Sequence, residues 1–212
     1  MTVGHLFDLD KTLVVYEPDV PGIFRNACDA VGVEPTEEAL DAIGPGYVET
    51  FKRFTESPYL GAARAARDAG LDVDPETFAR SYIDAELSAS VVPDGVPELL
   101  AELDHVGVVT NGYGPVQRRK LERTGLAAYI DALVCPDDVE AFKPDDTPFD
   151  EITARLPADE YVMVGDSVEY DIRPAAERGY RTVFVGEDDG GVADHRVLDP
   201  SELIRSPLVA QS

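Results

Sequence analysis

The chain has 212 residues, 44% of them hydrophobic, which is enough for one sizeable domain or a domain with a smaller insertion. It carries 42 Asp and Glu residues against 18 Lys and Arg, a formal net charge of −24 that is spread along the whole sequence. Charge of this sign and size argues against partners such as nucleic acid or a membrane surface, because their phosphates would repel it. It fits a halophilic protein kept in solution in concentrated salt, where screening lengths shrink to a few ångströms.

The expected location is the cytoplasm. No apolar run approaches the length that crosses a bilayer, and Met1 is followed directly by a strand pattern rather than by a signal peptide. Cys28 and Cys135 lie far apart without motif neighbours, which predicts reduced thiols. The sequence leaves the oligomeric state open.

Five short apolar, β-branched runs predict the strands of a sheet. In chain order they are Val3–Phe7, Val106–Thr110, Ala132–Cys135, Tyr161–Gly165 and Thr182–Val185. Segments with helical spacing separate the last four runs; the first of these segments has Pro115 near its start and Gly125 at its end, as a helix should. Continuous apolar strands that alternate with helices indicate an α/β fold with a Rossmann-like parallel sheet, covered on both faces.

The interval after the first strand has a different character. Residues 17–90 contain no convincing strand but several helical stretches, with TEEALDAIG before Pro45 and YVETFKRF after it as separate stretches. The last three stretches carry apolar residues at three- and four-residue spacing. We therefore expect two domains: a sheet domain made of residues 1–16 and 91–212, and an all-helical domain of residues 17–90 inserted into it.

Clusters of polar groups follow four of the five predicted strands, at the carboxyl ends where open parallel sheets bind ligands. They are Asp8 and Asp10, then Thr110, Asn111 and Gly112, then Lys143, and finally Asp166 with Asp171 on the next turn. Each has an ordinary explanation when taken alone, as a turn, a loop or a helix cap. Their combination at one sheet edge predicts a single site, in which two close carboxylates need a cation or a proton to relieve their repulsion.

Four segments carry a resemblance to a known family. DLDKTL, TNG, KPDDTPF and GDSVEYD occur in this order and resemble the four motifs of the haloacid dehalogenase-like (HAD) hydrolase superfamily. The resemblance covers nearly the whole chain, since the helical insertion after the first motif is similar to that family's cap domain. One departure is Lys11, which stands where glycine is common.

The resemblance implies a phosphatase that forms an aspartyl-phosphate intermediate with the help of Mg²⁺, a cation that prefers oxygen ligands. Asp8 would be the nucleophile and a metal ligand. Asp10 would bind the metal through its backbone carbonyl, and its carboxyl group would act as general acid and then as general base. Spaced two residues apart in an extended chain, Asp8 and Asp10 would point to the same side. Asp166 would supply the third metal contact.

The remaining motif residues would bind the transferring phosphate. Lys143 would stabilise the charge on its oxygens, and the Thr110 hydroxyl would donate beside it with the backbone amides of Asn111 and Gly112. Asp171 is expected to be a partner for Lys143 or for metal-bound waters.

The acid at position 10 favours a phosphatase, because dehalogenases of this superfamily lack it. A phosphonate-cleaving branch needs a cap lysine, and Lys52, beside Arg53 on a predicted helix, is expected to face solvent. A sugar-phosphate mutase shares all four motifs and remains an alternative, as does a phosphoacceptor or binding module without turnover. The expected substrate is a small-molecule phosphate ester, such as a phosphoglycolate-like acid or a sugar phosphate.

Overall fold

A computed structural model describes residues 1–209 as two compact units. The sheet unit comprises Met1–Val15 and the chain from Val91 onward, and the helical unit is Tyr16–Ser90. Within the described residues, no helix is long and apolar enough to cross a membrane. The chain passes between the units through two short strands that pair with each other, β2 (Val15–Tyr16) and β3 (Ser90–Val91).

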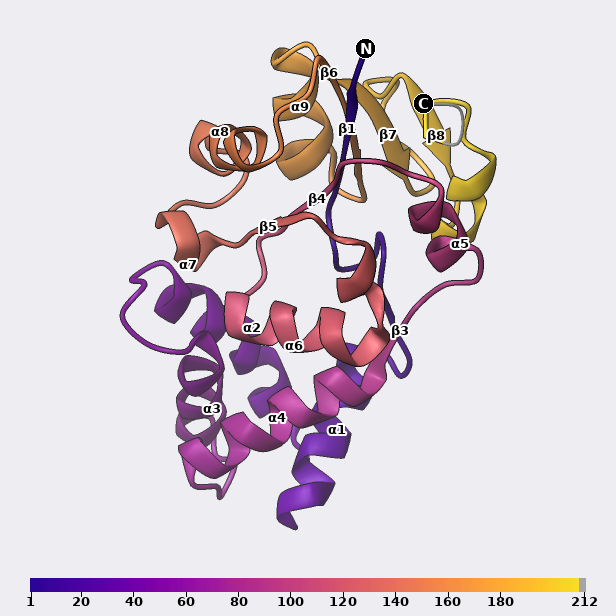
Figure 1. Cartoon of the computed structure of the whole chain (residues 1–212). Coiled ribbons are helices and arrows are strands. Elements are labelled where there is room, and N and C mark those ends of the chain that lie inside the picture. The colour runs from indigo at the N-terminus through magenta and orange to yellow at the C-terminus, as the bar shows by residue number, and fades with distance from the viewer. Residues whose placement is uncertain (210–212) are drawn as a thin grey trace. The chain divides into compact units, whose positions relative to one another are not determined.

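The sheet unit is built on a parallel sheet, as the alternation of strands and helices predicted (Figure 1). Within residues 1–209 the sheet has six strands in the order β5-β4-β1-β6-β7-β8, and every neighbouring pair is parallel. The strands are β1 (Val3–Phe7), β4 (Val106–Val109), β5 (Ala132–Val134), β6 (Glu160–Gly165), β7 (Arg181–Val185) and β8 (His195–Val197).

Helices connect these strands and cover both faces of the sheet. They are α5 (Val96–Ala101), α6 (Gly114–Thr124), η1 (Leu126–Tyr129), α7 (Pro136–Val139), α8 (Asp146–Arg155), η2 (Val168–Ile172), α9 (Arg173–Glu177) and η3 (Pro200–Arg205). Helix α6 has Pro115 in its first turn and is capped after Thr124 by Gly125, whose φ of 77° lies in the left-handed region.

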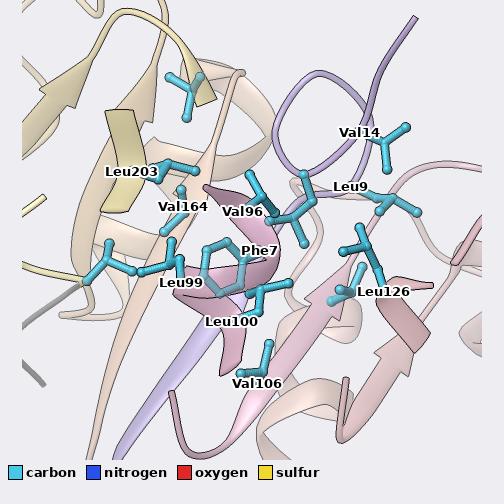
Figure 2. Packing of buried hydrophobic residues seen from close by; sticks show 14 of the residues in the cluster. Phe7, Leu9, Val14, Val96, Leu99, Leu100, Val106, Leu126, Val164 and Leu203 are labelled. Atoms are coloured by element: carbon cyan, nitrogen blue, oxygen red, sulfur yellow. The ribbon is translucent and has the colours of Figure 1, made fainter. Parts of the chain in front are cut away.

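The alternation of side chains along β1 divides the core between the two faces. Phe7 packs on one face against Leu99 and Leu100 of α5, as Figure 2 shows. Leu6, its neighbour, packs on the other face with Phe149 of α8. Successive residues of a strand point to opposite faces, so a strand buried on both sides is largely apolar. This explains why β1 reads as a mostly apolar run; its one polar side chain, His5, is buried with Nδ1 3.4 Å from the Asp104 carbonyl oxygen.

The five predicted strands are confirmed, each within one residue at either end. Strand β8 was missed, because its sequence His-Arg-Val is short and charged. It is the outermost strand next to β7, where solvent reaches one side. The short helix α7 was missed as well.

The helical unit contains helices α1 (Val20–Val31), α2 (Glu37–Phe51), α3 (Pro58–Asp68) and α4 (Pro75–Ala89). Its sequence predicted separate helical stretches before and after Pro45, but α2 runs through this proline without a break. Helices α2 and α3 pack closely: a Cβ on Gly61 would lie 2.6 Å from the carbonyl oxygen of Gly46. The unit has aromatic packing of its own, with the rings of Tyr47 and Tyr59 5.2 Å apart.

Candidate active site

Three neighbouring strands bring the predicted residues to one edge of the sheet. Strand β1 lies between β4 and β6, and Phe7 is level with Val108 and Val164 in the two registers. The residues that leave the carboxyl ends of these strands are Asp8 after β1, Thr110 after β4 and Asp166 after β6. The parallel register therefore gathers groups that are up to 158 positions apart in the chain.

Lys143 lies buried at the centre of this edge. Its Nζ donates to Asp8 Oδ1 at 2.7 Å, to Asp171 Oδ1 at 2.6 Å and to the carbonyl oxygen of Val109 at 2.7 Å. An ammonium group has three protons, so these contacts use all of its donors. A buried lysine is costly unless it is paired and hydrogen-bonded, and here both conditions are met.

The backbone of Lys143 is held by the side chain of Asn111. The Lys143 amide donates to Asn111 Oδ1 at 2.8 Å, and Asn111 Nδ2 donates to the Lys143 carbonyl at 2.9 Å. This two-way contact joins the loop after β4 to the loop that carries the lysine. The sequence suggested only the backbone amide of Asn111 as a functional group, and the structure gives its side chain this positioning contact.

Thr110 is buried with its hydroxyl oxygen accepting two hydrogen bonds. The Gly112 amide donates to Thr110 Oγ1 at 3.1 Å, and Gln117 Nε2 donates to the same atom at 3.2 Å. Because both bonds are accepted, the hydroxyl proton remains to donate to an anion. The Gly112 amide, which was expected to face a phosphate directly, is here used to orient the hydroxyl.

Asp171 reaches Lys143 only because position 165 is a glycine. A Cβ on Gly165 would lie 2.5 Å from the Asp171 Cβ and 2.4 Å from its Oδ2. Asp171 Oδ2 accepts from the Ser167 amide at 3.0 Å, while Oδ1 accepts from Lys143. Both oxygens of Asp171 are therefore fixed by neighbouring groups. The Ser167 hydroxyl accepts from the Tyr170 amide and caps the same turn.

The carboxylates of Asp8, Asp166 and Asp171 form a cluster in which one oxygen atom from each residue lies within 4.8 Å of the other two. One ammonium group, that of Lys143, is paired with two of them. Three carboxylates and one ammonium carry a formal charge of −2, which a divalent cation would neutralise. All the donor atoms are oxygens, the type that Mg²⁺ prefers, so the residues present fit this ion.

The electrostatics of the cluster also favour the binding of a cation. Burial raises the pKa of Asp8 to about 7, opposed by Lys143 and supported by the charge of Asp171. Burial and Asp171 raise the pKa of Asp166 as well. Burial by itself would lower the pKa of Lys143, but Asp171 and Asp8 raise it above its ordinary value. Lys143 stays charged, while Asp8 and Asp166 tend to take up a proton, which a bound cation would displace.

The carboxylate of Asp10 has different partners from that of Asp8. Strand β1 ends at Phe7, and Asp10 lies beyond it, where its Oδ1 pairs with Lys120 and its Oδ2 accepts from Gln117 Nε2 at 2.6 Å. Its carboxylate does not belong to the Asp8 cluster, and the backbone carbonyl is the Asp10 group that the family resemblance assigns to a metal.

Gln117 and Lys120 were missed from the sequence, although a signal for them is present. Helix α6 buries four residues of its middle turns, Val116, Gln117, Lys120 and Leu121. Helical periodicity places all four on one face, so two polar residues stand at positions where core residues are expected. A lysine on an apolar helix face, in a chain with four lysines, indicates a buried partner of opposite charge.

Lys11 follows Asp10 in a backbone conformation that explains the usual glycine. Its φ is 65°, in the left-handed region that side chains disfavour, and its amide donates to the Val14 carbonyl in the turn after β1. The side chain is exposed, and its charge opposes the rise in the pKa of Asp166. The substitution therefore keeps the turn and adds a positive charge that acts on the acidic cluster.

Comparisons with known proteins assign the chain to one family. Residues 5–185 match the family model of haloacid dehalogenase-like hydrolases. The ribulose-1,5-bisphosphate 5-phosphatase of Halopiger xanaduensis is 32% identical, covering 87% of this chain and 84% of its own. A phosphoglycolate phosphatase of Cereibacter sphaeroides is 31% identical, with coverages of 87% and 85%. The HAD hydrolase YfnB of Bacillus subtilis, solved bound to magnesium, shares the fold with a TM-score of 0.74 at 19% identity, covering 96% of this chain and 97% of its own.

Proposed function

Because the chain belongs to the haloacid dehalogenase-like hydrolases and is a phosphoric monoester hydrolase of that family, we propose that it is a Mg²⁺-dependent phosphatase that uses Asp8 as nucleophile. The observation that carries this proposal is the buried Lys143 bridge between Asp8 and Asp171, beside Asp166. This bridge holds the Asp8 carboxylate in place for attack on a phosphate, in a cluster whose formal charge of −2 a divalent cation would neutralise.

The metal site of the proposal consists of the carboxylates of Asp8 and Asp166 together with the backbone carbonyl of Asp10. A bound Mg²⁺ would offset the electrostatic repulsion between the anionic nucleophile and the anionic substrate. Asp171 is the third acid of the cluster, but both of its oxygens already accept hydrogen bonds, so we assign it to holding Lys143 and to metal-bound waters.

In the first step, an Asp8 carboxylate oxygen attacks phosphorus, and the bond from phosphorus to the leaving oxygen breaks. Asp10 donates a proton to that oxygen, which departs as an alcohol. In the second step, Asp10 takes a proton from water, whose oxygen attacks the phosphoaspartate and restores Asp8. The same side chain serves both steps because the first leaves it as a carboxylate.

Phosphoryl transfer is mostly positioning and charge stabilisation, and two side chains are suited to it. Lys143 Nζ lies 2.7 Å from Asp8 Oδ1, so its charge is within reach of a phosphoryl group on Asp8. The buried Thr110 hydroxyl has a proton to donate to a phosphoryl oxygen. Asn111 contributes by holding the Lys143 backbone, and Gly112 by orienting the Thr110 hydroxyl.

For the substrate, we propose a small phosphorylated metabolite. The named relatives act on ribulose 1,5-bisphosphate and on phosphoglycolate, both small anionic phosphate esters. We propose that the helical unit is a cap that closes over the site and excludes water during transfer. We also propose that the enzyme works in a salt-rich cytoplasm, because a charge of −24 disfavours a compact fold at low ionic strength and because both cysteines are buried free thiols.

The test is hydrolysis of 4-nitrophenyl phosphate in high salt, with Mg²⁺ and then with EDTA. Wild type should release phosphate only with the metal. Asp8→Asn, which keeps the side-chain size, should abolish release, and mass spectrometry should find a phosphorylated chain in wild type alone. Asp72→Asn is the matched control, because Asp72 is an exposed residue of the helical unit. Full activity of Asp8→Asn would refute the nucleophile, and conversion of a sugar phosphate without phosphate release would identify a mutase.

A further inference from the structure

The carboxylate of Asp10 is held on both oxygens by one helix. Lys120 and Gln117 lie three residues apart on α6 and therefore face the same side of it. The lysine pairs with Oδ1 and the glutamine donates to Oδ2 at 2.6 Å. Two donors on different oxygens fix the plane of the carboxyl group as well as its position, which a single contact would not do.

The exposure of this pair differs sharply between its members. The Lys120 side chain has no exposed surface, whereas 28% of the Asp10 side chain is exposed. The lysine thus supports the carboxylate from the protein interior, and the open part of Asp10 remains accessible to a bound molecule. A pair that served stability alone would not need a fully buried lysine beside a partly exposed aspartate, since burying a lysine is costly even when it is paired.

Gln117 connects Asp10 to the phosphate-binding end of the site. Its Nε2 group carries two protons, one directed to Asp10 Oδ2 and one to Thr110 Oγ1 at 3.2 Å. Its Oε1 is buried and has no hydrogen-bond partner among the described residues. An orphaned acceptor destabilises a fold, so the amide is better explained by its two Nε2 contacts than by stability.

The space for the Gln117 side-chain amide depends on Gly112, the glycine of the TNG motif. A Cβ on Gly112 would lie 1.7 Å from Gln117 Nε2. Glycine at this position therefore lets the Gln117 amide reach Thr110 and Asp10 together. A chain of hydrogen bonds runs from Lys120 through Asp10 and Gln117 to Thr110. It connects the Asp10 carboxyl, the proposed proton donor, to the Thr110 hydroxyl, which is proposed to bind phosphate.

We infer that Lys120 and Gln117 are positioning residues that aim the Asp10 carboxyl at the oxygen of the leaving group. This inference rests on the proposed function, in which Asp10 exchanges a proton with that oxygen. A misplaced proton donor hinders esters whose leaving oxygen must be protonated and has little effect on those whose leaving group departs as a stable anion.

The experiment compares phenyl phosphate with 4-nitrophenyl phosphate, two esters of similar shape whose leaving groups differ in their need for a proton. With Mg²⁺ in high salt, Lys120→Met should lower kcat/KM, which reports only the steps through departure of the leaving group, by about 100-fold for phenyl phosphate, the scale of a misplaced catalytic group, and by less than about 10-fold for 4-nitrophenyl phosphate. The value of kcat should fall for both esters, because Asp10 also serves as the base in the second step that they share. Asp10→Asn should show the same preference in stronger form.

Gln117→Met is the second variant, because it leaves the Asp10–Lys120 pair in place and is expected to fold even where Lys120→Met does not. Lys52→Met is the matched control: Lys52 is exposed and belongs to the helical unit, so both esters should react as with wild type. Equal losses of kcat/KM on the two esters in both variants, with Asp10→Asn still selective, would overturn the inference and leave the proposed function standing. Absence of turnover by wild type on both esters would refute the proposed function and the inference with it.

Discussion

Replacing Lys143 with methionine would remove the positive charge from the centre of the acidic cluster while keeping most of the side-chain volume. The Lys143 side chain is 1% exposed, and its partners Asp8 and Asp171 are 10% and 2% exposed, so neither carboxylate can recover its hydration. Removing one partner of a buried ion pair costs about 3–5 kcal/mol. For a chain of this size that corresponds to a fall in Tm of about 10 °C.

The loss should depend on pH in a defined direction. The pKa of Asp8 is raised to about 7 even with the lysine present, and removing the lysine raises it further. A carboxyl group with a raised folded-state pKa contributes stability that is complete below its unfolded value, near 4, and that is lost as the pH rises through the folded value. The penalty of Lys143→Met should therefore be largest at pH 8 and much smaller at pH 5, where the carboxyl group is protonated.

The assay is urea unfolding of wild type and variant in EDTA and high salt at both pH values. Lys52→Met is the control, because a change at an exposed lysine should stay within about 0.5 kcal/mol. Adding Asp171→Asn to Lys143→Met should restore part of the stability at pH 8, since one of the repelling charges is gone. A loss below about 1 kcal/mol, or equal losses at pH 5 and pH 8, would show that the cluster is not held together by the lysine charge.

Three further predictions concern the same site and the surface. Gly165→Ala should lower kcat by about 100-fold and Tm by several degrees, because the new Cβ would lie 2.5 Å from the Asp171 Cβ. Gly44→Ala is the control and should be neutral or stabilising, because open space surrounds its Cβ position. Equal effects of the two substitutions would contradict the packing argument. Mg²⁺ should raise Tm strongly at pH 8 and weakly at pH 5 in thermal scans, because protons compete for Asp8; a shift independent of pH would count against that carboxylate as a ligand. Raising KCl from 0.1 M to 2 M should raise Tm by about 10 °C through screening of the −24 charge, whereas no change would remove the argument for a halophilic protein.

The periodicity of apolar residues was sufficient to predict the sheet and the helical insertion. A strand buried on both faces is apolar at most positions, and this tendency made β1, β4 and β6 recognisable in the sequence. It fails where burial is partial: β8 lies at the sheet edge and carries His and Arg, so no apolar run marks it. Local signals also overstated the effect of Pro45, which α2 accommodates.

The motif residues could be assigned to one sheet edge from sequence because parallel strands present their carboxyl ends together. Their partners could not be assigned in the same way. Lys120 meets Asp10 across 110 positions and the Asn111 side chain meets the Lys143 backbone across 32, and such contacts depend on how α6 and the loops pack against the sheet. The sequence by itself determined which chemical groups the edge would carry; tertiary packing alone decided which carboxylate each lysine neutralises, because pairing depends on distance and burial rather than on order along the chain.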